Sequence, residues 1–244
     1  MVRPIEEQCN KTHLSIDMAE SREIVHRDYL GHVLRWSHVI KCIDSGETVL
    51  DLGSADCGMG MALYTNKYKP SRYVAVDIRQ GQLDLGKAKL GKANFPTEFH
   101  CLNLITEFDK IPRLDYSIIT SFEMIEHIPQ QFGEPLLKNI AGIMTPKTTF
   151  FLSTPCFSGS AAANHVHEYE YQELKDIITK YFRIEAHYGT FMRQSALKKV
   201  WSLEEMVLFE KLHEYYDSNL LSILFAPLHP EVASNCIWRL KLIA

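Results

Sequence analysis

Glutamate and histidine side chains that could carry out chemistry are concentrated in two short stretches of this chain. The first, SFEMIEHIP, holds Glu123, Glu126 and His127, and the second, HVHEYEY, holds His165 and His167. An imidazole titrates near neutral pH, which suits it to act as a general base. Two carboxylates and two imidazoles also suit a divalent metal ion. The residue types alone leave both kinds of chemistry open.

A strand, a tight turn and a helix are predicted in the sequence TVLDLGSADCGMGMALY. The apolar run from Thr48 to Leu52 predicts the strand, the small residues after it predict the turn, and the amphipathic pattern from Met59 to Tyr64 predicts the helix. A second apolar strand ends in Asp77, about twenty residues after the turn, where a carboxylate can accept both hydroxyls of a ribose. We therefore expect this stretch to bind a nucleoside.

These strands and the turn between them resemble the first two motifs of the class I methyltransferases that use S-adenosylmethionine. In that family the turn has the pattern acidic-x-Gly-x-Gly-x-Gly, and Asp51 occupies the acidic position. Ala55 and Cys57 stand where the second and third glycines are usual. Because neither residue adopts a positive φ cheaply, we expect either that the turn needs only one true glycine or that Gly58 has taken over the role.

The segment from Leu114 to Cys156 resembles the same family more closely. A predicted strand is followed by SFEMIEHIP, a helix LLKNIAGIM, a turn around Pro146 and a strand TFFLSTPC. The order resembles the family pattern of strand, E-x-I-E-H, helix, x-x-P-G-G, strand and S-T-P, although Lys147 and Thr148 replace the two glycines. With the first two motifs, the resemblance covers about residues 46–190. The chain is identified as a member of this family.

The resemblance implies an α/β fold with a Rossmann-like, mostly parallel sheet of seven strands in the order 3-2-1-4-5-7-6. The last strand is expected to be antiparallel, helices are expected on both faces, and a helical insertion is expected before the last strand. The resemblance also implies S-adenosylmethionine as the cofactor. The residues expected at the cofactor site are Asp51, Gly53, Ser54, Ala55, Asp77, Ile78, Asn103, Leu104 and Glu123.

The chain is expected to form a single methyltransferase domain. Residues 1–45 are expected to be an N-terminal arm and cap helix, 46–190 the cofactor-binding core, 190–234 a helical insertion or lid, and 235–244 the final strand. Apolar residues at spacings of three and four predict the cap helix from Ser21 to Ile43. Its polar residues could include a ligand for the cofactor carboxylate: His26, Arg27, His32, Arg35 and His38.

The cofactor carries an activated methyl group, so the protein need only hold the acceptor in line and remove its proton where necessary. We expect transfer to an oxygen or nitrogen of a small-molecule or nucleoside-like acceptor, with His127, His165 or His167 as the general base. The acceptor pocket is expected between the loop from Ser158 to His167 and the 190–234 insertion, whose aromatic side chains could cover an organic substrate.

Two alternatives stay open. Metal-dependent 2′-O-methyltransferases that act on RNA 3′ ends have a similar E-x-x-E-H, and their metal site could be copied here by Glu123, Glu126, His127 and either His165 or His167. A metal-free site is favoured because the pattern also occurs in metal-free relatives and the chain is not basic. In the second alternative, the substituted turn is closed and the chain is a non-catalytic scaffold, although the intact acidic residues of both motifs argue against this.

The composition limits the partners and the compartment. The net charge of −4 and the pI near 6.3 give no general attraction for nucleic acid, which is therefore not a favoured partner. The six cysteines form no C-x-x-C pair, which favours reduced thiols in the cytoplasm. No apolar run approaches a membrane span, and the N-terminus lacks the apolar core of a signal peptide. The acceptor and the oligomeric state are not indicated.

Overall fold

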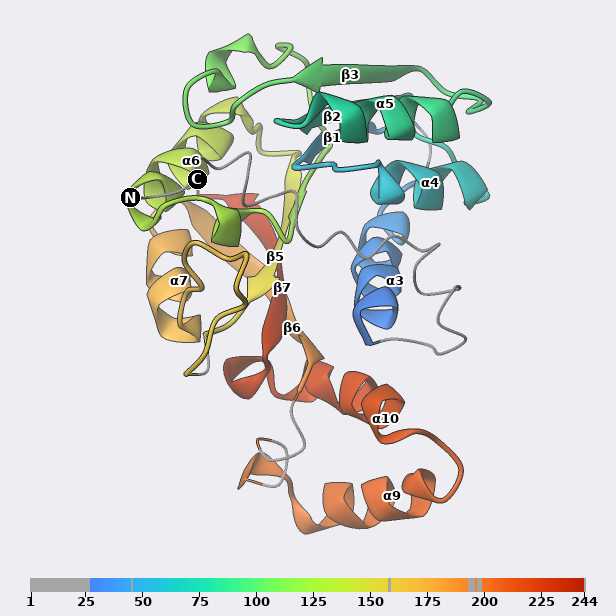
Figure 1. The fold of residues 1–244 in the computed structure, drawn as a ribbon, viewed down its shortest axis with the longest axis vertical. Coiled ribbons are helices and arrows are strands. Elements are labelled where there is room, and N and C mark those ends of the chain that lie inside the picture. The colour runs from blue at the N-terminus through green and yellow to red at the C-terminus, as the bar shows by residue number, and fades with distance from the viewer. Residues whose placement is uncertain (1–26, 45, 158, 193–195, 197–198, 244) are drawn as a thin grey trace.

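The computed structural model describes residues 27–44, 46–157, 159–192, 196 and 199–243. Its centre is a seven-stranded sheet with the order β3-β2-β1-β4-β5-β7-β6 (Figure 1). Strands β1 to β5 pair in parallel, and β7 runs antiparallel to both β5 and β6. The predicted strand order and the antiparallel last strand are both confirmed.

The strands lie close to their predicted positions. They are β1 (Thr48–Leu52), β2 (Arg72–Asp77), β3 (Thr97–Cys101), β4 (Ile118–Phe122), β5 (Thr149–Pro155), β6 (Phe182–Phe191) and β7 (Asn235–Leu242). The largest difference is at the start of β4, which was expected at Leu114. The backbone N–H of Tyr116 instead bonds to the carbonyl of Leu114 in a local turn, so pairing with β1 and β5 begins only after it.

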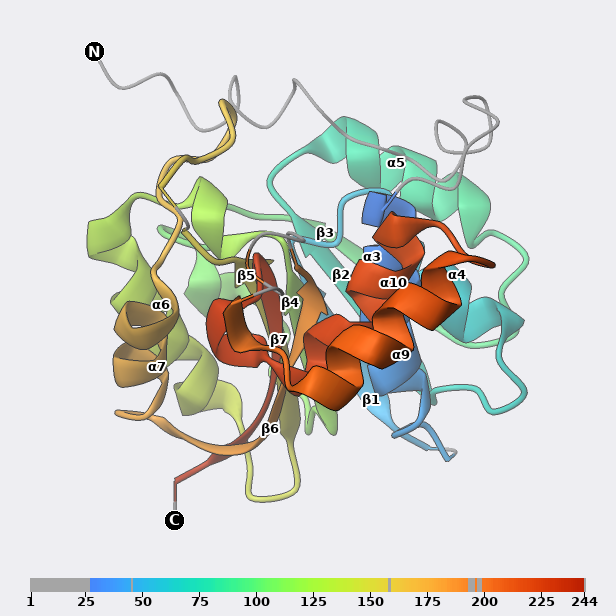
Figure 2. The same ribbon diagram turned by 90° about the horizontal axis from the view of Figure 1, so that it is seen from below.

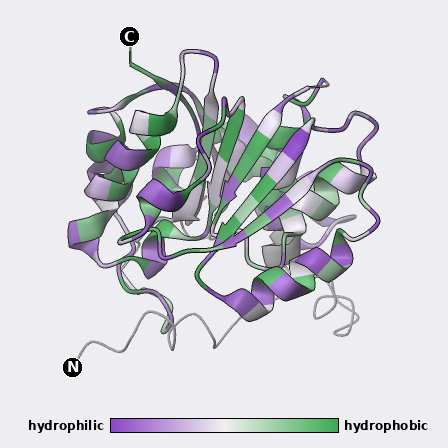
Figure 3. Cartoon of the chain, turned by 90° about the horizontal axis from the view of Figure 1, so that it is seen from above, coloured by the Kyte–Doolittle hydropathy of each residue, from purple (hydrophilic) through white to green (hydrophobic). Residues whose placement is uncertain are grey.

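Helices cover both faces of the sheet (Figures 1 and 2). One face carries α3 (Arg27–Ile40), α4 (Gly58–Thr65) and α5 (Gln80–Lys89), and the other carries α6 (Gln130–Ile143) and α7 (Tyr171–Ile178). Successive residues of a strand point to opposite faces. Leu50 and Val74 therefore join the core beneath α6 and α7, while Val49 and Ala75 join the core beneath α3, α4 and α5. Figure 3 shows hydrophobic residues concentrated along these central strands.

The turn after β1 takes a conformation that the sequence does not predict. Gly53, Ala55 and Cys57 all have positive φ, at 75°, 46° and 62°. Gly58 does not take over this role; a Cβ there would lie 2.8 Å from the Trp36 ring, so Gly58 is needed for helix packing. The expectation that Ala55 and Cys57 avoid positive φ is wrong. The Ala55 N–H donates to the Asp77 carboxylate at 2.8 Å, which helps to hold the strained backbone.

The insertion between β6 and β7 contains α9 (Leu203–His213) and α10 (Ser218–Phe225). Ser202 caps α9, and its hydroxyl accepts from the Glu205 N–H. The insertion has a small core of its own, in which Trp201 and Phe225 pack around the buried Phe209. Figure 1 shows α9 at the outer end of this unit and α10 nearer the sheet. Among the described helices, none is long and apolar enough to cross a membrane.

Candidate active site

The residues that could carry chemistry meet at the carboxyl ends of β1, β4 and β5. Strand β1 leads into the turn at Gly53, β4 leads into Glu123, and β5 leads into the loop that carries His165. Strands β1 and β4 are neighbours, although the connection between them along the chain passes through β2 and β3. Ligands of open α/β sheets bind where the strand order reverses in this way.

A short turn after β4 presents two of these residues. Glu123 has a positive φ of 53°, and a single 3-10 turn from Ile125 to His127 follows it. Glu126 is fully buried; its Oε2 accepts from the Thr154 hydroxyl at 3.0 Å, and its Oε1 has no hydrogen-bond partner in the described part of the chain. Burial raises the pKa of Glu126 well above its usual value, and the nearby charge of Glu123 adds to this effect. A buried carboxylate oxygen without a hydrogen-bond partner among the described residues, such as Glu126 Oε1, is suited to bind a cation.

The loop after β5 is fastened to this turn. The backbone N–H groups of Val166 and His167 both donate to the Glu126 carbonyl, at 2.8 and 3.0 Å. The His127 Nδ1 atom lies 3.1 Å from the carbonyl oxygen of Asn164. These three contacts bring His165 beside the turn, although the two segments are almost forty residues apart in the sequence.

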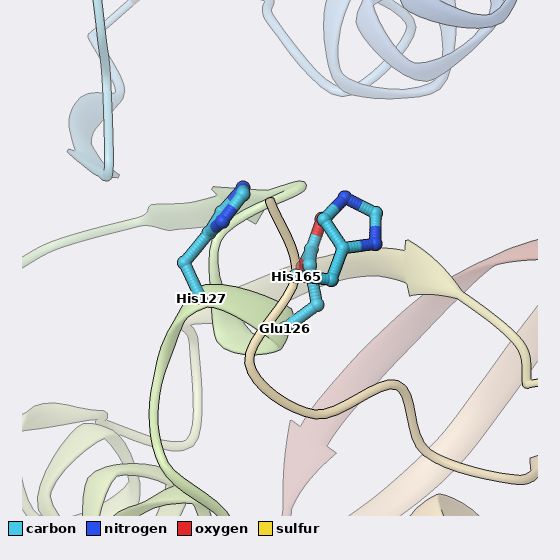
Figure 4. Close-up of side chains that lie close together, drawn as sticks. All are labelled: Glu126, His127 and His165. Atoms are coloured by element: carbon cyan, nitrogen blue, oxygen red, sulfur yellow. The ribbon is translucent and has the colours of Figure 1, made fainter. Parts of the chain in front are cut away.

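Glu126, His127 and His165 converge on one point (Figure 4). One potential ligand atom from each lies within 4.8 Å of the other two. The two imidazole rings meet edge to face, with 5.1 Å between their centroids. The spacing of the three donor atoms is suitable for a single metal ion bound between them.

Hydrogen bonds determine which nitrogen carries the proton in the neutral form of each ring. An ionised carboxylate and a carbonyl oxygen can only accept, so His165 donates from Nδ1 to Glu168 at 2.5 Å, and His127 donates from Nδ1 to Asn164. Burial also lowers the pKa of His127, which favours the neutral ring. When either ring is neutral, its Nε2 therefore carries the free lone pair. That lone pair can bind a metal or accept a proton.

Glu123 lies outside this triad. Its carboxylate accepts from Ser153 at 2.8 Å and from the Asn235 amide at 2.8 and 3.0 Å, and it lies 3.2 Å from the Arg35 guanidinium. Burial opposes the charge of Glu123, but Arg35 and the hydrogen bonds outweigh burial and hold the pKa below its usual value. Glu123 is thus already neutralised by protein groups.

His167, the other histidine of the loop, is also placed outside the triad. Its Nε2 lies 3.3 Å from a carboxylate oxygen of Glu173 in α7, and its ring contacts Tyr169 edge to face at 4.4 Å. Of the two loop histidines that the sequence could not distinguish, the structure brings only His165 to Glu126 and His127.

The turn after β1 and the end of β2 form the expected cofactor side of the site. Asp77 accepts from the Ala55 N–H at 2.8 Å, and its other oxygen accepts from the Arg79 N–H at 2.8 Å. Ile78 follows it. Asp51 faces inward, where it accepts from Tyr73 at 2.5 Å and from Thr120 at 2.8 Å.

The expected adenine side lies after β3. The Asn103 side-chain carbonyl accepts from the Ile105 N–H at 2.9 Å in a local turn, and Leu104 is buried beside it. Near the ends of β1 and β4, the hydroxyls of Ser54 and Ser121 are buried and lack a protein partner among the described residues. Buried polar atoms of this kind usually have a partner, so their presence fits a polar ligand such as S-adenosylmethionine.

The cap helix contributes one residue to the centre of the site. Of its five candidates, Arg35 is buried against Glu123, and its Nε has no partner within the described residues. His32 lies beside Arg35, and His38 instead stacks on Tyr188 at 4.5 Å. Arg27 begins α3, and His26 lies outside the described residues.

Three residues of the site are not predicted by the sequence. Ser153 and Thr154, which bind Glu123 and Glu126, belong to the STP sequence that was recognised only as a strand motif. Asn235 follows a long insertion, and no local pattern marks it as a partner of Glu123.

Comparisons with known proteins agree with this fold. A family model described as a methyltransferase domain, Methyltransf_23, matches residues 22–203. No curated protein matches the chain. Solved structures share the fold: a SAM-dependent methyltransferase from Leishmania major is 12% identical with a TM-score of 0.62, over 97% of this chain and 81% of that one.

Two further solved structures are similar. A TehB-like SAM-dependent methyltransferase from Corynebacterium glutamicum is 10% identical with a TM-score of 0.55, over 86% of this chain and 87% of that one. The small RNA methyltransferase HEN1 is 15% identical with a TM-score of 0.60, over 87% of this chain and 25% of that one. The family model spans most of the chain, and the sheet order is that of the family. The chain therefore belongs to the class I methyltransferases, enzymes that use S-adenosylmethionine as the methyl donor.

Proposed function

We propose that this enzyme methylates an oxygen atom of an acceptor that carries two neighbouring hydroxyls, with the help of a divalent metal ion. The observation that supports the proposal is the convergence of Glu126, His127 and His165, whose donor atoms lie within 4.8 Å of one another. Two imidazoles and one carboxylate form a ligand set that leaves positions open for substrate oxygens. This proposal reverses the preference for a metal-free site that the sequence suggested.

The groups that surround the triad are also those expected around metal ligands. The backbone carbonyl of Asn164 and the carboxylate of Glu168 accept hydrogen bonds from the Nδ1 atoms of His127 and His165, as partners of metal-binding histidines usually do. The Glu126 Oε1 atom, which has no hydrogen-bond partner among the described residues, would be a ligand of the ion. A bound divalent ion would supply Lewis acidity, which favours loss of a proton from a neighbouring acceptor hydroxyl.

S-adenosylmethionine supplies the activated methyl group. We propose that the turn residues Gly53, Ser54 and Ala55 lie along it, that Asp77 and Ile78 bind its ribose, and that Asn103 and Leu104 flank its adenine. Arg35 would bind the carboxylate of the cofactor through its Nε, which has no partner within the part of the chain that the structure describes. Asp51 and Glu123, in contrast, would act through the protein groups that they already bind, Tyr73 and Arg35.

The acceptor pocket is proposed between the loop that carries His165 and the insertion between β6 and β7. Pro155, the last residue of β5, pairs with Asn235, the first residue of β7, so the loop and the insertion begin and end side by side. The pocket would take a small molecule or a nucleoside. A ribose with free 2′ and 3′ hydroxyls has the two neighbouring hydroxyls that the proposed reaction requires.

The 3′-terminal ribose of an RNA offers the same two hydroxyls, and one solved structure of similar fold is named as a small RNA methyltransferase. The net charge of −4 gives no general attraction for a long RNA. We therefore favour a nucleoside-sized acceptor. The experiment below must distinguish this acceptor from the 3′ end of an RNA. A reducing cytoplasm would suit the thiols, because the cysteines of the described residues are all free.

A metal-free mechanism is the second candidate. The hydrogen bond from His165 to Glu168 would make His165 a stronger general base, without any ion. His127 would then hold the acceptor rather than a metal.

Methyl transfer from radiolabelled S-adenosylmethionine separates these possibilities. The acceptors would be adenosine, a catechol and a short RNA, each beside a matched analogue that lacks one of the two hydroxyls. The proposal expects transfer only to the intact diols, loss of transfer in excess EDTA, and recovery with Mn²⁺ or Mg²⁺. Full turnover in EDTA would contradict the metal and leave His165 as the base.

A further inference from the structure

The insertion leaves and rejoins the sheet directly beside the active site. Strand β6 ends at Phe191, and the chain returns at Asn235, which pairs with Phe191 on one side and with Pro155 on the other. A Cβ at Gly189 would overlap the Ala226 carbonyl, so the base of the insertion packs tightly against β6. The insertion, from Met192 to Ser234, is called the lid below.

The Asn235 side chain joins the two ends of the lid to β4. Asn235 is 7% exposed, and its Oδ1 accepts from the Thr190 hydroxyl at 2.7 Å. Its Nδ2 donates to both carboxylate oxygens of Glu123, at 3.0 and 2.8 Å. The amide therefore connects the last residues of β6, the first residue of β7 and the residue after β4.

Glu123 in turn holds the segment that presents the triad. Its φ of 53° is uncommon for a residue with a side chain, and such a backbone persists only where surrounding contacts fix it. Here the contacts come from Asn235, Ser153 and Arg35. Glu126 and His127 lie three and four residues further along the same turn.

We infer that Asn235 is a positioning residue through which the lid sets the geometry of Glu126 and His127. A shift of the lid moves Asn235, and Asn235 moves Glu123 and the turn behind it. By the reciprocity of linked equilibria, a ligand at the active site must then alter the lid to the same extent. The expected effect on metal binding rests on the proposed function. The link between the lid and the turn is independent of that function.

The test compares the wild type with Asn235→Ala, and with Thr190→Val as a milder variant that only frees the amide oxygen. Amide hydrogen exchange would be followed in the lid, from 203 to 225, and in the turn, from 123 to 128, with S-adenosylhomocysteine and with added Mn²⁺. Glu204→Gln, an exposed residue of α9, is the control for a change within the lid that leaves the link intact.

In the wild type, ligand binding should slow exchange in the lid by about fivefold or more, and Asn235→Ala should abolish most of this response. The variant should also bind Mn²⁺ about fivefold or more weakly. Glu204→Gln should respond as the wild type does.

The double variant Glu123→Gln/Asn235→Asp reverses donor and acceptor across the same contact. It should recover at least part of the lid response, which a merely destabilised protein would not. A lid that responds to ligand equally in the wild type and in Asn235→Ala would overturn the inference. If the wild type binds no Mn²⁺, the proposed metal site is wrong. The response of the lid to S-adenosylhomocysteine then tests the link between the lid and the turn on its own.

Discussion

The His165 imidazole donates from Nδ1 to the Glu168 carboxylate at 2.5 Å, and both side chains are largely buried. Glu168 also accepts from the backbone N–H of Ala162 at 3.0 Å. One carboxylate therefore closes the loop on itself and sets the direction in which the other nitrogen of His165 is available. The loop does not need a regular helix or strand to hold a reactive group.

The first prediction concerns this carboxylate. Glu168→Gln keeps an oxygen that can accept a hydrogen bond but removes the charge that makes His165 a stronger ligand or base. We expect Mn²⁺ affinity, or turnover if no metal is used, to fall by about 10–100-fold. Titration calorimetry and methyl-transfer rates would measure these effects. A Glu168→Gln protein with wild-type values for both would show that the contact only closes the loop.

The second prediction compares two glycines of α6. A Cβ at Gly133 would overlap the Tyr169 hydroxyl, whereas a Cβ at Gly142 would have no atom within 4 Å. Gly142→Ala should stabilise the protein by up to about 1 kcal/mol, because alanine favours a helix. Gly133→Ala should destabilise it by about 1–3 kcal/mol, and adding Tyr169→Phe should recover part of the loss. Urea unfolding would measure all three variants. Equal effects at both glycines would be inconsistent with the packing of α6 on Tyr169.

The sequence was sufficient for the sheet because each strand carries its own hydrophobic signal. Apolar runs such as Tyr73 to Val76 predict buried strands, and the motif order then gives the topology. The limits of β4 were less certain, since Leu114 is apolar but belongs to a local turn. Positive φ at Ala55 and Cys57 could not be predicted, because distant partners such as Asp77 stabilise it.

The site was predictable in its residue types but not in its pairings. Glu126, His127 and His165 were all candidates, yet His167 was an equal candidate by sequence. The two histidines differ because His167 contacts Glu173 of α7 and therefore lies away from the triad. Similarly, Glu123 was a candidate metal ligand by sequence. Arg35 and Asn235, which come from the two ends of the chain, respectively pair with its charge and donate a hydrogen bond to it.

The third prediction uses the pH dependence of stability. Burial raises the pKa of Asp51 from 3.8 to about 6, although Tyr73 and Thr120 donate hydrogen bonds to it. The folded protein therefore holds this proton more tightly than the unfolded chain, and the contribution of Asp51 to stability falls as pH rises from about 4 to about 6.

Asp51→Asn cannot ionise and lacks this dependence. Between about pH 4 and about pH 7, the difference in free energy of unfolding should move in favour of the variant by about 2 kcal/mol. Urea unfolding of both proteins at the two pH values would measure the change. A difference that stays constant with pH would mean that Asp51 keeps an ordinary pKa.

The fourth prediction tests the cofactor side. Asp77→Ala removes the acceptor for the Ala55 N–H and the proposed partner of the ribose hydroxyls. Binding of S-adenosylhomocysteine should weaken by about 1–3 kcal/mol in calorimetry. Asp84→Ala, on the exposed side of α5, should bind as the wild type does. Wild-type affinity in Asp77→Ala would remove Asp77 from the cofactor site.

The central claim is that Glu126, His127 and His165 hold a divalent ion. The most direct measurement is anomalous diffraction at the manganese edge from crystals grown with Mn²⁺ and S-adenosylhomocysteine. The account predicts one strong anomalous peak in contact with all three side chains and with no direct bond to Glu123. S-adenosylhomocysteine bound in its site, with no manganese peak at these three residues, would contradict it.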